Sequence, residues 1–338
     1  MTKPIQRAAN RLPLRVEDGW LDGDVHARFH RTSIVGLTYQ TNSKKLFDSR
    51  TKTDKHRRKG CARSFVPTAL WTCAVNEEAF IFKICILASS SAGNATFLAT
   101  DRTRILIDAG LSRREIAKRL ASIGEDIDGL NAILVTHEHS DHTNGLSALV
   151  KASAANLPVY LTQGTSEFIE WRECTPVLQS FQAGRSFSIG DFEVASFTIP
   201  HDAVDPVGFT VTAHGIKVSI ATDLGYITDS LRVHLRATDL LILESNHDLE
   251  MLRVGPYPWS VKQRVMSRRG HLSNEVAADF IEHDLDTSVS TLVLGHISEH
   301  NNHPELVRHA ASKALNGRAL FTRLFVAEPN MQSEVFCY

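Results

Sequence analysis

The sequence lacks the features that indicate a membrane protein, a secreted protein or a disulfide scaffold. Among its 338 residues, no apolar run approaches the roughly 18 residues that a membrane span needs. The N-terminus has no compact apolar segment of the secretory type. The five cysteines form no CxxC pair and leave one over, as is typical of reduced thiols in a cytoplasmic protein. A content of 43% hydrophobic and 22% charged residues indicates a globular chain.

A large net charge is also missing, but the near-neutral total hides an uneven distribution. The formal charge of −1 gives no overall cationic face for nucleic acid or an anionic membrane. Residues 1–82 hold 15 Lys and Arg against 8 Asp and Glu, a balance of +7, whereas residues 83–338 hold 22 against 30, a balance of −8. The total charge therefore does not exclude nucleic acid as a partner.

The first 82 residues differ from the rest in hydrophobic pattern and in composition. They have little hydrophobic periodicity, and the run TKTDKHRRKG (Thr51–Gly60) cannot bury apolar area. We expect a poorly ordered basic leader or an over-extended gene model at 1–82, and a folded domain at 83–338. The alternative for 1–82 is a basic arm that tethers nucleic acid, but the cluster is short and lacks interleaved aromatic residues.

From Phe80 onward, short apolar runs alternate with helical patterns. The first run, Ile81–Ala88, leads into a polar turn, SSSAGN (Ser89–Asn94). Further strand-like runs lie at 104–107, 132–135, 192–199, 217–221, 240–243 and 291–294, and helical patterns at 113–122, 146–155, 274–283 and 304–315. Short buried strands that alternate with helices predict an α/β protein whose sheets are covered by helices.

An acid or an imidazole follows each of six predicted strands at its carboxyl end. In chain order these are Asp108, the segment HEHSDH (His137–His142), His201, Asp223, Glu244 and His296. Ligands gather at this edge in α/β folds, because loops there present polar groups without burying them unpaired. Imidazole and carboxylate suit Zn²⁺ and similar divalent ions.

The spacing within HEHSDH divides the ligands between two ions. His137 and His139 are separated by one residue and can reach one ion from a tight turn, whereas Asp141 and His142 point elsewhere. A carboxylate that bridges both ions would complete a two-metal site, and Asp223 is the candidate. Two such ions can hold a hydroxide and stabilise charge on the attacking and leaving oxygens.

HEHSDH also matches the HxHxDH motif of a known superfamily, and other segments extend the match. They are KICILASSSAGNATF (83–97), IDAG (107–110), PHDAVDPVGF (200–209), TDLG (222–225), ESNHD (244–248), GPYP (255–258), GHLSN (270–274) and GHISEHNNHPE (295–305). On these segments the chain resembles the YycJ/WalJ-like branch of the metallo-β-lactamase superfamily. The resemblance covers roughly 83–315; residues 1–82 have no counterpart, and SSSAGN stands where the family commonly has SGSSGN.

The resemblance implies an αββα sandwich with a dimetal site between strand ends. It assigns His137, His139 and His201 to one ion, Asp141, His142 and His296 to the other, and Asp223 to both. Asp141 is also counted among the catalytic residues, and Asp108 is better placed to orient ligands than to bind directly. Zn²⁺ is the expected ion, with Mn²⁺ or Fe²⁺ as alternatives. Only 47 residues separate Asp223 from His271, which leaves no room for a β-CASP insertion.

His271 has a different expected role. The phosphodiesterase branches of the superfamily carry a similar His before the last His ligand and pair it with an acid, which corresponds to Glu244. Phosphodiester hydrolysis expels an alkoxide that needs a proton, and a carboxylate keeps the imidazole charged and oriented. The alternatives are that His271 caps the helix that starts near Ser273, and that Glu244 forms a structural salt bridge.

Three arginines, Arg264, Arg268 and Arg269, form a basic cluster just before His271. We interpret them as a clamp for substrate phosphates, the alternative being a solvated helix end. The resemblance implies a DNA exonuclease that acts 5′ to 3′ on double-stranded DNA by dimetal-activated hydroxide attack. A small-molecule phosphodiesterase of cyclic or nucleotide diesters is the main alternative, and a lactone or thioester hydrolase is less favoured because it has no need of the pair formed by His271 and Glu244.

Overall fold

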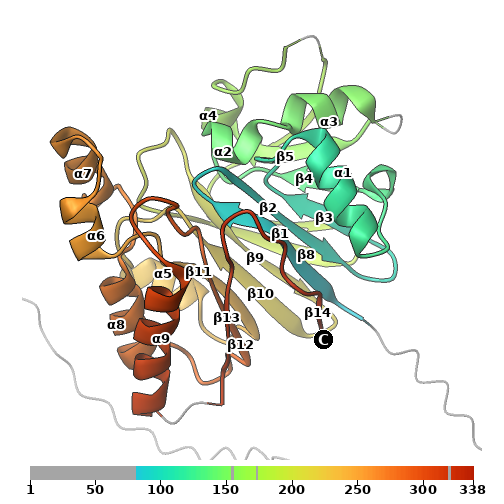
Figure 1. Cartoon of the computed structure of the whole chain (residues 1–338). Coiled ribbons are helices and arrows are strands. Elements are labelled where there is room, and N and C mark those ends of the chain that lie inside the picture. Colours follow the sequence, from blue (N-terminus) through green and yellow to red (C-terminus); the bar gives the residue numbers. More distant parts are fainter. Residues whose placement is uncertain (1–80, 154–155, 173, 319–320) are drawn as a thin grey trace, which may run out of the picture. The chain divides into compact units, whose positions relative to one another are not determined.

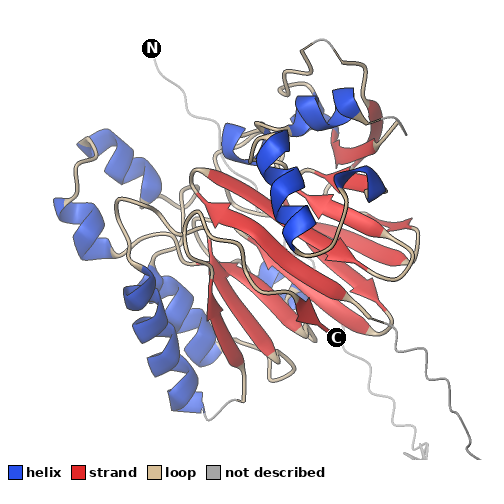
Figure 2. Ribbon diagram, turned by 45° about the vertical axis from the view of Figure 1, so that its right-hand side comes forward, coloured by secondary structure: helices blue, strands red, loops and turns tan. Residues whose placement is uncertain are grey.

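The computed structural model describes residues 81–153, 156–172, 174–318 and 321–338. These residues form two seven-stranded sheets that lie face to face, with helices on their outer sides (Figure 1). Figure 2 shows the same arrangement with the helices in blue flanking the red strands. The predicted αββα fold class is confirmed. All but the last two residues of the expected leader at 1–82 lie outside the described residues.

The first sheet has the order β14-β1-β2-β3-β4-β5-β6. Its strands are β1 (Lys83–Ser90), β2 (Gly93–Ala99), β3 (Arg104–Ile107), β4 (Ala132–Leu134), β5 (Pro158–Thr162), β6 (Val177–Phe181) and β14 (Phe336–Cys337). The pairs β1–β2 and β2–β3 are antiparallel, whereas β3 to β6 are parallel. The predicted polar turn at 89–94 is shorter than expected, because β1 continues to Ser90 and β2 starts at Gly93.

The second sheet has the order β13-β12-β11-β10-β9-β8-β7. Its strands are β7 (Ser186–Ile189), β8 (Phe192–Thr198), β9 (Val207–Ala213), β10 (Ile216–Ala221), β11 (Leu240–Glu244), β12 (Thr291–Gly295) and β13 (Arg323–Val326). Strands β7 to β10 pair antiparallel, and β10 to β13 pair parallel. The two sheets thus share one design, with an antiparallel part and a parallel part.

The connections between strands contain the helices. They are α1 (Arg113–Ser122), η1 (Ile127–Gly129), α2 (Ser140–Thr143), α3 (Leu146–Ala152), α4 (Gln163–Ser166), α5 (Asp229–His234), α6 (Leu249–Val254), α7 (Trp259–Val265), α8 (Asn274–His283) and α9 (Pro304–Arg318). The helical patterns at 113–122 and 274–283 coincide with α1 and α8. Each of these begins after a serine whose hydroxyl accepts a backbone N–H of the first turn, Ser112 and Ser273. None of the described helices combines the length and apolar character that a membrane crossing requires.

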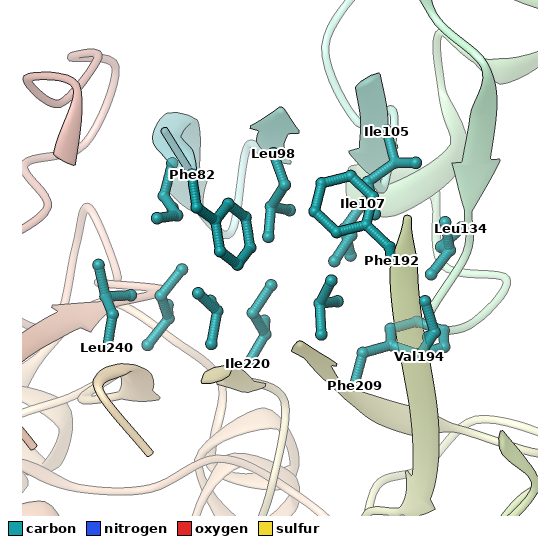
Figure 3. Close-up of a cluster of buried hydrophobic side chains, with 14 of the residues drawn as sticks. Phe82, Leu98, Ile105, Ile107, Leu134, Phe192, Val194, Phe209, Ile220 and Leu240 are labelled. Carbon is teal, nitrogen blue, oxygen red and sulfur yellow. The ribbon is translucent and has the colours of Figure 1, made fainter. Parts of the chain in front are cut away.

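Apolar side chains fill the space between the sheets and the spaces under the helices. Between the sheets, Leu98 and Ile105 from the first sheet face Phe192 and Phe209 from the second (Figure 3). Because strand side chains alternate, the opposite faces of the strands pack under helices, as Phe97 does in the cluster that includes residues of α1. Burial on both faces explains why the strands are nearly continuous apolar runs in the sequence.

Candidate metal centre and active site

The polar residues that follow the strands meet where the two sheets present their carboxyl ends. Strands β3 and β4 are parallel neighbours, and so are β10, β11 and β12, so the residues after each set share an edge. The seven predicted ligands fall into two groups, His137, His139 and His201 in one and Asp141, His142, Asp223 and His296 in the other. Within each group, the potential ligand atoms lie within 4.8 Å of one another.

The first group consists of three imidazoles. Nδ1 of His139 lies 3.1 Å from Nε2 of His137 and 3.3 Å from Nε2 of His201. The second ring nitrogens of the other two contact protein oxygens: Nδ1 of His137 lies 3.0 Å from the Thr136 hydroxyl, and Nδ1 of His201 lies 3.3 Å from the Gly270 carbonyl. Such contacts fix the ring orientations and turn one nitrogen of each ring toward the centre of the group.

The second group combines two imidazoles with two carboxylates. Nε2 of His142 lies 3.4 Å from Asp141 Oδ2 and 3.3 Å from Asp223 Oδ2. Nε2 of His296 lies 3.5 Å from Asp141 Oδ2 and 3.3 Å from Asp223 Oδ1. Oδ1 of Asp223 also lies 3.9 Å from Nε2 of His201, which belongs to the first group. The Asp223 carboxylate therefore stands between the two groups.

Two buried atoms of the second group have no hydrogen-bond partner within the protein, Oδ2 of Asp223 and Nε2 of His296. A buried polar atom left without a partner costs about 1–3 kcal/mol. A cation between them would satisfy both atoms, and imidazoles with carboxylates at this spacing are the donors that divalent metals prefer. The residues therefore fit divalent metal ions.

Asp108 lies behind the second group and hydrogen-bonds directly to one of its members, His142. Nδ1 of His142 donates to Oδ2 of Asp108 at 2.8 Å, and the backbone N–H of Thr136 donates to Oδ1 at 2.8 Å. Because Nδ1 of His142 is engaged in this way, Nε2 is the nitrogen that faces the group. Asp108 thus fixes the His142 ring, and its role in orienting a metal ligand stays a prediction.

Three residues of the site have a left-handed backbone although none is glycine. The φ angles are 61° at Asp108, 60° at Asp223 and 55° at His296. Such conformations are unfavourable for ordinary residues and concentrate at functional sites. At His296 the surroundings hold the backbone in place, because Asn246 Nδ2 donates to its carbonyl at 2.8 Å and Ser89 Oγ accepts from its N–H at 2.8 Å.

Glu244 is fully buried and connects His271 to His296. Its Oε1 accepts from Nδ1 of His271 at 2.8 Å and from Nδ1 of His296 at 2.7 Å. Its Oε2 accepts the backbone N–H groups of Leu224 at 2.9 Å and Leu272 at 3.1 Å. Both oxygens are thus saturated, and both rings are fixed by one carboxylate.

Burial and charge shift the pKa values of these groups in opposite directions. Burial lowers the pKa of His137 and of His201, which favours the neutral, metal-binding imidazole. Burial also acts to lower the pKa of His296, but the charge of Asp223, the nearby Asp141 carboxylate, and the hydrogen bond and charge of Glu244 raise it to about 10. For His271, the charge and hydrogen bond of Glu244 likewise outweigh burial, so that its pKa lies above the ordinary value.

Comparison with known proteins now identifies the family. The β-lactamase superfamily domain matches residues 103–297. The exodeoxyribonuclease WalJ of Streptococcus pneumoniae serotype 2 (strain D39 / NCTC 7466) is 37% identical over 230 residues, which are 67% of this chain and 85% of that protein. The exodeoxyribonuclease YycJ of Bacillus anthracis is 37% identical over 233 residues, which are 68% and 88% of the two chains. This chain belongs to the WalJ/YycJ branch of the metallo-β-lactamase superfamily. The predicted family and the predicted hydrolase class are confirmed.

Solved structures support the fold of this WalJ/YycJ-family chain. The metallo-β-lactamase fold protein YhfI from Bacillus subtilis superimposes with a TM-score of 0.59 at 18% identity, and covers 77% of this chain and 100% of that chain. The Zn(2+)-bound PqqB from Methylobacterium extorquens gives a TM-score of 0.56 at 17% identity, and covers 75% and 99%. At these identities the similarity concerns the fold alone.

The three arginines expected to clamp phosphate in this WalJ/YycJ-family chain, Arg264, Arg268 and Arg269, lie close to His201 but have different partners. Arg264 forms an ion pair with Asp202, the residue after His201. Nε of Arg269 donates to the His201 carbonyl at 3.0 Å. The guanidinium of Arg268 lies over the ring of Tyr226 instead. Two of the three arginines are thus bound to the loop that carries a candidate ligand.

Sequence reasoning missed several residues that this WalJ/YycJ-family site uses. Thr136 donates its hydroxyl to Asp108 at 2.9 Å, and the only sequence signal is its place before His137. Asn94 Nδ2 lies 3.2 Å from Asp141 Oδ2, and it belongs to the segment that was read as a polar turn. The alternative that His271 caps a helix is wrong, because the cap of α8 is Ser273, whose hydroxyl accepts the backbone N–H of Val276.

Proposed function

We propose that this chain hydrolyses phosphodiester bonds in DNA, as an exonuclease that degrades double-stranded substrate from the 5′ end. The observation that carries the proposal is the pair formed by His271 and Glu244 beside the two ligand groups. A proton donor held at such a place suits a reaction that expels an alkoxide. The names of the WalJ and YycJ relatives support DNA as the substrate, and the 5′ to 3′ direction rests on the family resemblance.

In this proposal, the two ligand groups hold two divalent ions. One would be held by His137, His139 and His201, the other by Asp141, His142 and His296, with Asp223 shared. When bound, such ions supply the Lewis acidity that activates water and stabilises negative charge on the reacting phosphate. We propose Zn²⁺ because the first group consists of imidazoles alone, with Mn²⁺ and Fe²⁺ as alternatives.

His271 is positioned to deliver a proton to the leaving oxygen. Its ring centroid lies 5.2 Å from that of His201 and 5.2 Å from that of His296, so it stands between the two groups. About a fifth of the side chain is exposed (20%), which leaves a path to substrate. Glu244 holds Nδ1, and Nε2 is the nitrogen left to give a proton to the leaving group.

A substrate panel tests the proposal. A 5′-labelled DNA duplex and a cyclic dinucleotide are incubated with the protein and a divalent metal. We expect release of short labelled products from the duplex, with a rate that falls steeply with salt. An intact duplex together with an opened cyclic dinucleotide would replace the nuclease by the small-molecule phosphodiesterase. We also propose a cytoplasmic location, as the sequence predicts, and a DNA substrate is compatible with it.

The role of His271 is tested on bis-p-nitrophenyl phosphate and on the duplex. We expect His271→Ala to lower kcat on DNA by roughly 10²–10⁴-fold, the range of general acid catalysis, with metal content unchanged. His309→Ala, which alters an exposed histidine of α9, serves as the matched control. Unchanged turnover in His271→Ala on both substrates would eliminate the proton-donor role.

A further inference from the structure

A pocket of about 390 Å³ adjoins the candidate metal centre. Its wall includes His201, one of the predicted ligands, together with Tyr226, Arg268 and Arg269. The pocket also contains one carboxylate, Asp205. Two guanidinium groups against one carboxylate leave the pocket with net positive charge, although residues 83–338 as a whole carry −8.

Arg268 differs from the neighbouring arginines in having unused hydrogen-bond donors. Arg264 is paired with Asp202, and Arg269 donates to the backbone of the loop at His201. Among the residues that the structure describes, the guanidinium of Arg268 makes no hydrogen bond or ion pair; its carbon lies 4.0 Å from the centre of the Tyr226 ring. A guanidinium stacked on an aromatic ring keeps its N–H groups available at its edge, where they can bind a phosphate.

The position of this stack relative to the reacting groups is fixed by the backbone. Tyr226 follows Asp223 by three residues, and Arg268 precedes His271 by three. Between them, Gly225 packs directly on Arg268, since a Cβ at position 225 would lie 2.4 Å from the Arg268 carbonyl carbon. The backbone N–H of Gly225 also donates to the Pro200 carbonyl at 3.0 Å. The stack is therefore attached to the segments that carry Asp223 and His271.

We propose that this pocket is a subsite for the phosphate adjacent to the scissile one, with Arg268 as the residue that binds it and Tyr226 as the residue that positions Arg268. The inference rests on the proposed function and specifies its substrate: a strand with a second phosphodiester beside the one that is cleaved. A diester with a single phosphate, such as bis-p-nitrophenyl phosphate, leaves the subsite unused. Chain length should therefore affect turnover independently of the base sequence.

The experiment compares a 5′-labelled single-stranded trinucleotide, the labelled duplex and bis-p-nitrophenyl phosphate. We expect Arg268→Gln to lower kcat/KM on the trinucleotide and the duplex about tenfold, mostly through KM, as loss of one charge-assisted contact implies. The loss on bis-p-nitrophenyl phosphate should be several times smaller. On the duplex, the slope of log affinity against log salt should decrease by about 0.9, the change for one phosphate contact.

Two further variants separate binding from positioning. Tyr226→Phe retains a ring under the guanidinium and should keep most of the activity on DNA, whereas Tyr226→Ala should resemble Arg268→Gln. Arg102→Gln is the matched control for charge, because Arg102 is exposed and lies in the turn before β3, at the end of that strand opposite to Asp108. It should leave the salt slope and KM unchanged.

The outcomes distinguish this inference from the proposed function. If Arg268→Gln lowers kcat/KM by the same factor on all three substrates, or on none of them, the subsite is refuted. Cleavage of the duplex by the wild-type protein would still support the nuclease in that case. If the wild-type protein hydrolyses bis-p-nitrophenyl phosphate but neither DNA substrate, the nuclease and the subsite fall together.

Discussion

Replacement of Glu244 by glutamine is the most informative single change in the site. The carboxylate is fully buried and accepts four hydrogen bonds, two from the imidazoles of His271 and His296 and two from backbone N–H groups. Glutamine has nearly the same shape, but one of its two terminal groups is a donor. Whichever way the amide turns, its NH₂ faces two donors and leaves them without an acceptor.

The size of the effect follows from these contacts. An unsatisfied buried donor costs about 1–3 kcal/mol, so two of them should make Glu244→Gln less stable by roughly 2–6 kcal/mol. The loss depends on pH. In the folded state burial acts to raise the pKa of the Glu244 carboxylate, but the charges and hydrogen bonds of His271 and His296 lower it. The contribution of the carboxylate to stability is therefore lost as the pH falls. Because the pKa of His271 is raised in the folded state, the contribution of the His271 imidazolium to stability is lost as the pH rises. The difference between wild type and variant should therefore be largest between about pH 4.3 and pH 6.5, the ordinary pKa values of the two groups.

Urea denaturation of chelator-treated protein across this pH range measures the stability difference, and pH–rate profiles with metal measure the catalytic one. Without the Glu244 carboxylate, only the charge of Asp223 still opposes the effect of burial, so the pKa of His271 falls and the alkaline limb of the profile should move to lower pH. Glu275→Gln, at an exposed position of α8, is the matched control and should change stability by less than about 0.5 kcal/mol. Equal stability of Glu244→Gln and wild type, with an unmoved alkaline limb, would mean that the Glu244 carboxylate neither stabilises the fold nor raises the pKa of His271.

Three other perturbations test the metal centre and the core. Binding of Zn²⁺ to chelator-treated protein should release protons, because His142 and His296 have raised pKa values and must deprotonate to become ligands; titration in weakly buffered solution measures the release, and its absence would contradict the assignment. Gly110→Ala would place a Cβ 1.6 Å from the carbonyl oxygen of Asp141 and so displace this candidate ligand. The metal content measured by plasma emission should therefore drop, and a wild-type metal content in the variant would contradict this prediction. Leu98→Ala, between the sheets, should cost about 2–5 kcal/mol by urea denaturation, and a loss under 1 kcal/mol would mean that the core there is loosely packed.

Much of the site could be predicted because its ligands are placed by strand ends. Each buried strand is a short apolar run, and the residue that follows it must lie at the sheet edge, whatever the details of packing. For this reason the sequence predicted that Asp108, Asp223 and His296 approach HEHSDH from different parts of the chain. The two groups of potential ligand atoms in the structure have the composition that the family resemblance implies.

The residues that the sequence did not reveal act through contacts that have no periodic or motif signal. Thr136 and Asn94 orient ligands from positions that read as a strand end and a turn. The left-handed backbone at Asp223 and His296 depends on neighbours that are distant in sequence. Roles within the arginine cluster could not be separated either, because Arg264 and Arg268 look alike until Asp202 and Tyr226 are found beside them. Tertiary contacts decide these roles.

Two of the strands that the sequence analysis did not predict, β2 and β6, have a similar explanation. β2 begins inside the segment that reads as a polar turn, and its alternation is obscured because all seven of its residues are buried. β6 is mostly exposed at the edge of its sheet, so it lacks the apolar run by which a buried strand is recognised. Pairing with neighbouring strands, rather than local pattern, determines both.

The dependence of DNA degradation on two bound metal ions is tested most directly by measuring activity as a function of metal loading. Chelator-treated protein is titrated with Zn²⁺ or Mn²⁺, and bound metal and degradation of a 5′-labelled duplex are measured on the same samples. We expect activity to rise to a maximum at two bound ions per chain, chelation to abolish it and added metal to restore it. A protein that binds two ions and leaves the duplex intact with every metal tested would not be a dimetal DNA exonuclease.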